Sequence, residues 1–414
     1  MKGFLAIDKS PADEQGVRVD GSGASGPTSV SLRGVDVVLM VSGHEVTNPR
    51  IYARQALSLQ RLGANVTVVG RIEHRPSGEA RVLAVSAPSS RLVRFLCQPL
   101  RCLWAARHLT PDVVHFHDAE MLTILPIAKL WWRRSKFIYD AREDFGNMML
   151  VRDWLPSAVK PAVRFLTEVV ERGLARLADA IVGVTPPLTA KFRHRKKIVA
   201  YNFVPDDFFE QTAKAKRDPR VREFDVVHLG TLNLRRAAFL AETLREFHRL
   251  RPRARSLVIG ASAEIEAALR PRVPEGCVLL GKTPFEEIPG LLGNAKVGLD
   301  VHPWLGPHLE VALAVKVCEY MAAGCAVVAS TMPVLNQLLV EAGANSDSIN
   351  IIEGGEPLDY AQAALRLVEA IEGGDDPGAQ LRALAFEHLR WENEAVKIAR
   401  LYLQLLGKPC VTHS

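Results

Sequence analysis

Short apolar runs rich in β-branched residues alternate along the chain with longer stretches in which apolar positions recur every three or four residues. Runs of the first kind are typical of strands buried on both faces, and stretches of the second kind of amphipathic helices, so the pattern predicts β-α units with a parallel sheet. Six or seven such strands make a complete doubly wound sheet. The strands expected in the first half are 35–42, 65–70, 81–87, 112–117, 136–140 and 179–184.

The alternation breaks between residues 201 and 224, where prolines and charges follow neither a helical nor a strand period. We therefore predict a linker at 206–224, between an N-terminal domain at 35–205 and a C-terminal domain at 225–385. The fold class expected is α/β, with two facing Rossmann-like doubly wound domains and a cleft between them. The strands expected in the second domain are 224–230, 255–260, 277–281, 295–302 and 325–330.

Both ends of the chain are expected to lie outside the two sheets. Residues 1–34 are predicted to be a flexible leader, because residues 8–31 are rich in Gly, Ser, Asp and Pro. Their opening, MKGFLAIDKSPADEQ, is polar where a signal peptide needs an apolar stretch. An amphipathic stretch from about 379 to 406 has no strand after it. The segment 386–414 is therefore predicted to be a C-terminal helix that packs on either domain, with a crossing back to the N-terminal domain as one option.

Composition narrows the function class. The 414 residues are 48% hydrophobic and 24% charged, which excludes collagen-like, disordered and coiled-coil proteins and leaves room for two domains. The six cysteines include no pair with zinc-site spacing, and no apolar stretch is long enough to span a bilayer, so a cytoplasmic protein is expected. The net charge of +6 is uneven, since residues 35–205 hold 25 Lys and Arg against 14 Asp and Glu. This excess of positive charge in the N-terminal half of the chain indicates a polyanionic partner, either nucleic acid or an anionic membrane surface.

Polar side chains follow several of the first-half strands, where ligands of an open α/β sheet bind. Gly43 would let backbone amides approach a ligand, although an ordinary tight turn explains it equally well. His115 and His117 face the same side of one strand. Because no third His or Cys ligand lies nearby, they suit a polyhydroxylated ligand better than a metal ion. Asp118, and Arg142 and Glu143 after the next strand, add ionisable groups there.

The second half carries features of a nucleotide site. A strand ending at Gly230 is followed by a polar loop and a helix start with Arg235 and Arg236, which is how a diphosphate is held, although paired arginines are more often a solvated face. Lys316 and Glu319 lie on one face of a helix, where a carboxylate suits the vicinal hydroxyls of ribose, or where the two form a surface ion pair. Neither a GxGxxG after the first strand nor a P-loop is present, so redox dinucleotide and P-loop chemistry lose support.

The order and spacing of these motifs resemble the retaining glycosyltransferases of family four, the group 1 glycosyltransferases, which have the GT-B fold. The resemblance covers about residues 35–405 and rests on VTNPRIYARQALSLQRLGANVTVVG, DVVHFHD, YDARED, HLGTLNLRR, LGKTPFEEIPGLLGNAKVGL and KVCEYMAAGCAVVAS. It implies that the C-terminal domain binds a nucleotide-sugar donor and the N-terminal domain the acceptor, with no metal ion or other cofactor.

The resemblance also implies roles for single residues. Glu319 matches the second Glu of the family's E-x7-E pattern; Val311 stands at the place of the first, and Glu310 is one position off register. Thr231 stands where many members have a phosphate-binding Arg. The catalytic residues implied are His117, Arg236 and Lys316. The donor-binding residues implied are Gly43, Gly230, Thr231, Arg235, Gly281, Lys282, Thr283, Glu310 and Glu319. The acceptor-side candidates are His44, Asn48, His115, Asp118, Arg142 and Glu143.

The function expected is retaining transfer of a hexose from a nucleotide diphosphate sugar, with UDP favoured over GDP. The acceptor expected is a glycan or lipid-linked glycan in bacterial cell-surface polysaccharide or glycolipid synthesis. Basic and aromatic side chains in 89–109, 131–137 and 191–197 suggest peripheral docking at the inner face of the plasma membrane, or else solvated helices of a basic protein. The alternatives are a catalytically degenerate GT-B partner, a nucleotide-sugar epimerase, and a nucleic-acid-binding protein, although no recognition motif supports the last.

Overall fold

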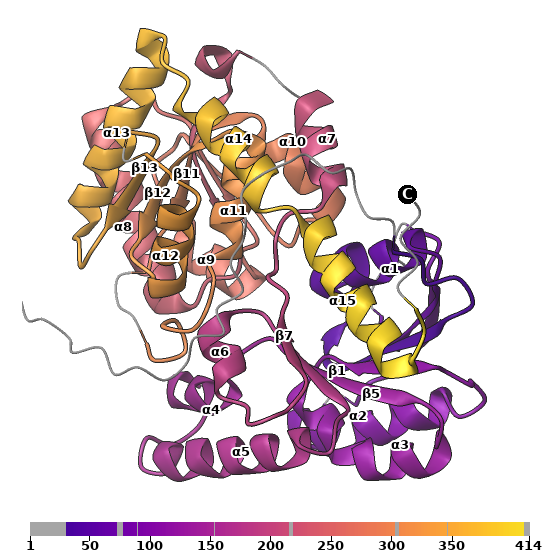
Figure 1. Cartoon of the computed structure of the whole chain (residues 1–414). Coiled ribbons are helices and arrows are strands. Elements are labelled where there is room, and N and C mark those ends of the chain that lie inside the picture. The colour runs from indigo at the N-terminus through magenta and orange to yellow at the C-terminus, as the bar shows by residue number, and fades with distance from the viewer. Residues whose placement is uncertain are drawn as a thin grey trace, which may run out of the picture.

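The computed structural model describes residues 30–72, 78–88, 90–152, 154–214, 218–302, 306–345 and 347–409. Most of the leader predicted at 1–34 lies outside the described residues. Two parallel sheets form two separate α/β layers, and the last helix runs from the C-terminal domain back onto the N-terminal one (Figure 1). The predicted fold class is confirmed.

The N-terminal domain is built on a seven-stranded parallel sheet with the order β3-β2-β1-β4-β5-β6-β7. Its strands are β1 (Asp36–Glu45), β2 (Asn65–Arg71), β3 (Arg81–Ala84), β4 (Val113–Phe116), β5 (Lys136–Ala141), β6 (Ala180–Gly183) and β7 (Lys197–Val199). The strand order reverses between β1 and β4, which makes that point the ligand-binding edge of a doubly wound sheet.

Helices cover both faces of this sheet. They are η1 (Arg50–Ala56), a π-helical stretch that continues into α1 (Leu57–Arg61), then α2 (Arg91–Ala105), η2 (Ala119–Ile124), α3 (Leu125–Trp131), α4 (Phe145–Met148), η3 (Met149–Val151), α5 (Lys160–Ala175) and α6 (Pro186–Ala190). Alternate residues of β1 point to opposite faces: Leu39 packs in the core under η1, and Met40 in the core under α2 and α3.

The C-terminal domain repeats the arrangement with six parallel strands in the order β10-β9-β8-β11-β12-β13. The strands are β8 (Phe224–Leu229), β9 (Ser256–Ile259), β10 (Cys277–Leu280), β11 (Ala295–Asp300), β12 (Ala326–Ser330) and β13 (Ile349–Ile352). Its helices are α7 (Asp206–Lys214), η4 (Pro219–Val221), α8 (Leu234–Leu250), α9 (Ala263–Leu269), η5 (Phe285–Glu287), α10 (Ile288–Leu292), α11 (Val315–Ala323), α12 (Pro333–Glu341), α13 (Pro357–Gly373) and α14 (Pro377–His388).

The segment predicted to be an irregular linker, 206–224, contains a helix. Two aspartates open α7, as suits a helix N-terminus, and Phe208 and Phe209 enter the core of the C-terminal domain beside α10 and α11. The first connection between the domains is therefore confined to residues 200–205, just before α7.

The last amphipathic stretch forms two helices rather than one. The first, α14, packs on α11 of the C-terminal domain, and the second, α15 (Trp391–Leu406), packs on η1 and α1 of the N-terminal domain. Figure 1 shows α15 in yellow as it crosses between the domains. The crossing begins where Val204 pairs with Arg390, and Trp391 is completely buried in the N-terminal core. Of the two options left open for this segment, the structure has the crossing.

Candidate functional site

Polar residues gather at the carboxyl ends of the strands that flank each switch point. In the N-terminal sheet these ends belong to β1 and β4, with β5 next to β4, and in the C-terminal sheet to β8 and β11. Contacts between the domains join the two edges: Thr185 Oγ1 donates to the Val311 carbonyl at 2.6 Å, and Lys282 Nζ lies 3.0 Å from Glu45 Oε1. The two ligand-binding edges thus face each other.

Asp118 organises the loop after the first strand. Its carboxylate accepts the backbone N–H groups of Ser42 at 2.9 Å and Gly43 at 2.8 Å, and lies 2.6 Å from His44 Nδ1. Burial alone would raise the pKa of Asp118, but the hydrogen bond and charge of His44 outweigh it and hold the pKa below its usual range. Two sequence expectations are modified here. Asp118 anchors the loop rather than facing an acceptor, and the Gly43 amide is engaged by Asp118 rather than free for a phosphate.

Glu120 lies directly over the same glycine. A Cβ on Gly43 would come within 2.7 Å of Glu120 Oε1, so only glycine fits without displacing the carboxyl group. Burial, together with the nearby negative charge of Asp118, raises the pKa of Glu120 to about 7. Glu120 is a further buried acid on this edge, which the sequence expectations did not include.

The two histidines after β4 stack on one another and have different surroundings. Their ring centroids are 4.9 Å apart, as expected of residues on one side of a strand. His115 Nδ1 lies 2.7 Å from the Tyr402 hydroxyl of α15, so this side chain joins the helix to the sheet rather than facing an acceptor. His117 is also buried, and neither of its ring nitrogens has a hydrogen-bond partner among the described residues. Its pKa is far below the usual value, chiefly through burial, so the ring is neutral.

A buried ion pair lies beneath these histidines. Asp140 accepts hydrogen bonds from Arg50 Nε at 3.1 Å and Arg50 Nη2 at 3.0 Å, and it lies 3.5 Å from His117 Nδ1. Burial opposes ionisation of Asp140, but the Arg50 charge prevails and lowers the pKa to about 2. The negative charge below the rings is therefore permanent at neutral pH, and it fixes the place of the Arg50 guanidinium.

The remaining acceptor-side candidates line the same edge. Arg142 is half-buried, and its Nη1 has no partner among the described residues. Glu143 lies 4.0 Å from His44 Nε2. Asn48 stands at the start of η1, where its Oδ1 accepts the Arg50 backbone N–H. Arg142 Nη1, both ring nitrogens of His117 and Nε2 of His115 thus have no hydrogen-bond partner among the described residues.

On the opposite edge, two cationic side chains and a histidine surround one carboxylate. Asp300, at the end of β11, is completely buried and lies 3.2 Å from Lys316 Nζ, 3.2 Å from His302 Nε2 and 3.8 Å from Arg236 Nη2. Burial would raise the pKa of Asp300, but Lys316 and His302 lower it far below the usual value. Gly230 has the left-handed φ of +111°, and a Cβ there would lie 3.4 Å from Lys316 Nζ. Lys316, Arg236 and Gly230 are therefore brought together as expected, around an acid that was not expected.

Other predicted donor-site residues lie around this cluster. Thr231 and Arg235 are exposed at the start of α8, which Asn233 caps through the Arg236 backbone N–H. Gly281 and Thr283 form a turn after β10, closed by a hydrogen bond from Thr283 Oγ1 to the Gly281 carbonyl at 3.2 Å. Lys282 is exposed and pairs with Glu45 of the N-terminal domain. Glu310 is exposed in the turn before α11.

Glu319 is engaged by the other domain. Its Oε1 accepts a hydrogen bond of 2.9 Å from Arg54 Nη2, and both side chains are at least nine-tenths buried. Arg54 also donates from Nε to the Phe203 carbonyl at 2.6 Å and lies over the Phe285 ring, next to the turn at Gly281. The predicted ribose-binding carboxylate is therefore one half of a buried interdomain ion pair, which sequence reasoning did not foresee.

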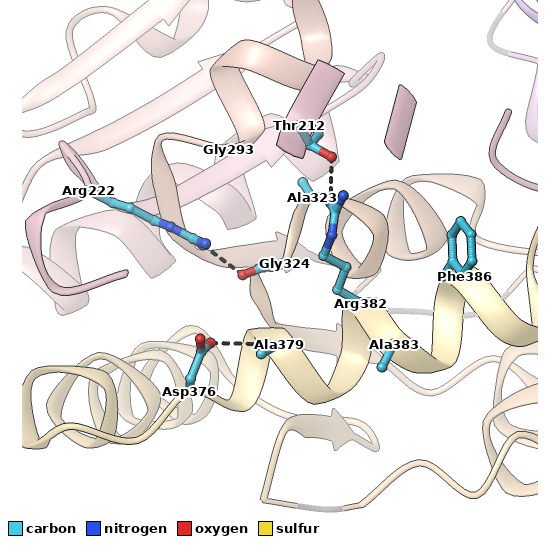
Figure 2. A pocket seen from close by; sticks show the side chains of 10 residues that line it. All are labelled: Thr212, Arg222, Gly293, Ala323, Gly324, Asp376, Ala379, Arg382, Ala383 and Phe386. Atoms are coloured by element: carbon cyan, nitrogen blue, oxygen red, sulfur yellow. Dashed lines mark hydrogen bonds between the residues drawn. The ribbon is translucent and has the colours of Figure 1, made fainter. Parts of the chain in front are cut away.

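A pocket behind α11 is separate from this site (Figure 2). Figure 2 shows Arg222 and Arg382 reaching the C-terminal end of α11 from two sides. Arg222 Nη1 donates to the Gly324 carbonyl at 2.7 Å and Arg382 to the Ala322 carbonyl, so both guanidinium groups satisfy carbonyls that the helix leaves without partners. These arginines stabilise the helix end rather than mark a ligand.

Within the part of the chain that the structure describes, no group of three or more His, Cys, Asp or Glu side chains is arranged to hold a metal ion. None of the helices described there is long and apolar enough to cross a bilayer.

Both domains of the chain match models of known protein families. Residues 31–205 match the model of a glycosyl transferase 4-like domain, and residues 223–370 the model of group 1 glycosyl transferases. No curated protein matches the chain as a sequence relative.

Solved structures are similar in fold. Sucrose-phosphate synthase from Thermosynechococcus elongatus is similar over 90% of this chain and 99% of its own, with a TM-score of 0.65 and 16% identity. HepE from Anabaena, solved with UDP and glucose, is similar over 88% of this chain and 98% of its own, with a TM-score of 0.63 and 14% identity. A glycosyltransferase from Rickettsia africae is similar over 91% of this chain and 99% of its own, with a TM-score of 0.59 and 13% identity.

Proposed function

Because this chain belongs to the group 1, GT4-like glycosyltransferases, which use nucleotide sugars, we propose that it transfers a hexose from a UDP-sugar with retention of configuration. The observation that carries this proposal is the cluster of Arg236, Lys316 and Gly230 at the switch point of the C-terminal sheet. Arg236 and Lys316 lie in the first turns of α8 and α11, and Gly230 directly follows β8, which is the arrangement in which a diphosphate is held.

The cluster is suited to stabilising a departing diphosphate. Retaining transfer without a covalent carboxylate needs negative charge on the leaving group to be met as the sugar becomes oxocarbenium-like, which is electrostatic work. Lys316 Nζ lies 3.2 Å from Asp300, and Arg236 Nε donates to the Val301 carbonyl at 3.2 Å, so both cations are positioned before a ligand arrives and little reorganisation is needed when the diphosphate binds. The negative charge of Asp300 offsets part of the desolvation penalty for burying these two cations.

The sugar is proposed to lie between this cluster and His117. A buried ring with two nitrogens that have no protein partner is unfavourable unless a ligand supplies hydrogen bonds. A sugar hydroxyl is suited to that place, because the neutral imidazole offers one donor and one acceptor. Arg142 Nη1 offers a further donor on the same edge.

The structure of HepE with UDP-glucose supports UDP over GDP as the nucleotide. The turn from Gly281 to Thr283 is proposed to frame the base and Glu319 to accept the ribose hydroxyls. The acceptor is proposed to be a glycan or lipid-linked glycan of bacterial cell-surface polysaccharide or glycolipid synthesis. The exposed basic stretches on the N-terminal domain support the proposal that the enzyme acts at the inner face of the plasma membrane.

The donor is tested by calorimetric titration of the purified protein with UDP-glucose, UDP-galactose and GDP-mannose, followed by nuclear magnetic resonance of the product anomer. We expect a UDP-sugar to bind and Arg236→Gln to weaken it by about 10-fold to 100-fold, as for a lost charged hydrogen bond. The matched control is Arg249→Gln, an exposed arginine at the far end of the same helix. Absence of binding by every donor contradicts the proposal, and an epimerised donor without acceptor would assign the epimerase alternative.

A further inference from the structure

Three helices on one side of the N-terminal sheet turn large apolar side chains to the solvent. Phe95, Leu96 and Trp104 of α2, Trp131 of α3, and Phe165 and Leu166 of α5 are between 44% and 69% exposed. All three helices cover the same face of the sheet, and α2 and α5 both pack on η2. Figure 1 shows α5 and α3 along one edge of the molecule, away from the C-terminal domain. We call these six side chains the three-helix face.

The pattern of α5 shows that this exposure is not incidental. Only Glu171 and Ala175 of its sixteen residues are buried against the domain. Its apolar residues at 165, 166, 169 and 170 follow a helical spacing of three and four, yet the stripe they form is exposed. A helix with its apolar stripe turned to water lacks the contact that such a pattern normally makes, and a large apolar patch of this kind marks a binding surface.

The charged residues around the three-helix face indicate what binds to it. Exposed arginines flank the three-helix face on every helix: Arg101 and Arg107 on or after α2, Arg133 and Arg134 after α3, and Arg164 and Arg176 on or after α5. A second copy of this chain would bring the same arginines against each other. An anionic bilayer instead accepts the apolar side chains in its interface and the guanidinium groups among its headgroups. Trp104 and Trp131, whose ring centroids are 6.2 Å apart, are of the residue type that prefers that interface.

The face adjoins the boundary between the domains at one end. The chain that leads into α5 passes Val151, and a Cβ on Gly306 of the C-terminal domain would lie 3.8 Å from Val151 Cγ1. An acceptor whose lipid stays in the bilayer under α5 would therefore present its headgroup close to where the two ligand-binding edges meet.

We propose that the three-helix face is the membrane-docking surface of this enzyme, with α5 lying flat in the interface of an anionic bilayer. The purpose of docking, delivery of a lipid-linked acceptor, rests on the proposed function. Binding to lipid is nevertheless measurable without any enzymatic activity.

The test is flotation of the full-length protein with vesicles of phosphatidylcholine alone and of equal parts phosphatidylcholine and phosphatidylglycerol. We expect binding to the anionic vesicles only. The variant F165E/L166E should abolish it, and R133Q/R134Q should weaken it by roughly 30-fold, from about one kcal/mol for each basic residue. The matched control is V340E, since Val340 is an equally apolar, 81% exposed residue on α12 of the other domain. Circular dichroism confirms that each variant is folded.

Flotation that survives F165E/L166E, or that V340E reduces as strongly, overturns the proposal. So does absence of flotation together with a dimer, measured by light scattering, that F165E/L166E dissociates, because the face would then be a protein interface. Failure of donor binding with intact flotation would refute the proposed function and leave the docking surface standing.

Discussion

Arg54 ties the two domains together through the buried carboxylate of Glu319, and its replacement is the sharpest test of the site. The ion pair is 2.9 Å long, and the Arg54 and Glu319 side chains are 1% and 10% exposed. Arg54→Met removes the charge and keeps the unbranched length. Because Glu319 stays behind in the protein interior, we expect the free energy of unfolding to fall by about 3–5 kcal/mol.

The loss should depend on pH in a direction that the structure fixes. Burial raises the pKa of Glu319 above its ordinary value of 4.5, and the Arg54 charge opposes this. In Arg54→Met the pKa of Glu319 rises further, so the folded state keeps a proton that the unfolded state has lost. Stability of the variant therefore falls as pH rises above about 4.5, and its deficit against the wild type widens until the folded-state pKa is passed.

Donor binding gives a second readout. If Glu319 accepts ribose hydroxyls as a carboxylate, its protonation in Arg54→Met should weaken UDP binding by roughly 10-fold to 150-fold at neutral pH, the worth of a charged hydrogen bond. Binding should recover at higher pH as Glu319 ionises. A purely structural role for Arg54 would lower stability without this recovery.

Double-variant cycles and a control complete the assay. The double variant Arg54→Met/Glu319→Gln removes both charges. Its loss of free energy of unfolding should therefore be smaller than the sum of the losses in the two single variants. Losses of free energy of unfolding that are simply additive, as measured by urea denaturation, would refute the reasoning. Arg61→Gln is the control, because Arg61 pairs with Asp207 at the surface, with both side chains about half exposed, and such pairs contribute about 0.2–1 kcal/mol.

Three further outcomes are expected. Asp300→Asn leaves Lys316 without its counter-charge, so the thermal stability of the free protein should fall and UDP should restore more of it than in the wild type; an equal shift by UDP in both proteins would exclude the proposed role of Asp300. Glu120→Gln should flatten the loss of stability that we expect between about pH 4.5 and 7, because the pKa of Glu120 is raised to about 7 by burial and by Asp118; an unchanged slope of melting temperature against pH would contradict it. Tyr402→Phe leaves His115 Nδ1 buried without its partner, so unfolding should need about 1–3 kcal/mol less while UDP affinity stays constant.

The sequence pattern was sufficient for most of the architecture because the strands are buried on both faces and their apolar runs are unmistakable. The elements it missed are short and lie where burial is partial. The strand β13 is the edge of its sheet, and only Ile349 of its four residues is fully buried. The helix α7 buries only Phe208, Phe209 and Thr212, and this small buried face stabilises the helix only once α10 and α11 are in place.

The site residues could be predicted where they directly follow a strand, but not where they depend on pairing with a residue far away in the sequence. His117, Gly230 and Lys316 stand out by position in the sequence. Asp300 lies within the expected strand 295–302 and ends the observed β11, but an acid beside a phosphate site runs against simple charge complementarity. Arg54 could not have been found, since its partner is 265 positions away and nothing in a helix stripe marks one arginine as buried.

The domain crossing and the donor site are parts of one structure. Trp391, at the start of α15, donates from Nε1 to the Arg54 carbonyl at 2.8 Å, and the Arg54 side chain holds both the Phe203 carbonyl of the connecting segment and Glu319. A change in the angle between the domains must therefore either move Glu319 or break one of these buried bonds, each of which is costly to leave unmade. Because Lys316 lies one helical turn before Glu319 on α11, the diphosphate cluster shares that dependence. The geometry of the connection thus sets the geometry of the donor site, although Trp391, Arg54 and Phe203 lie outside the phosphate cluster itself.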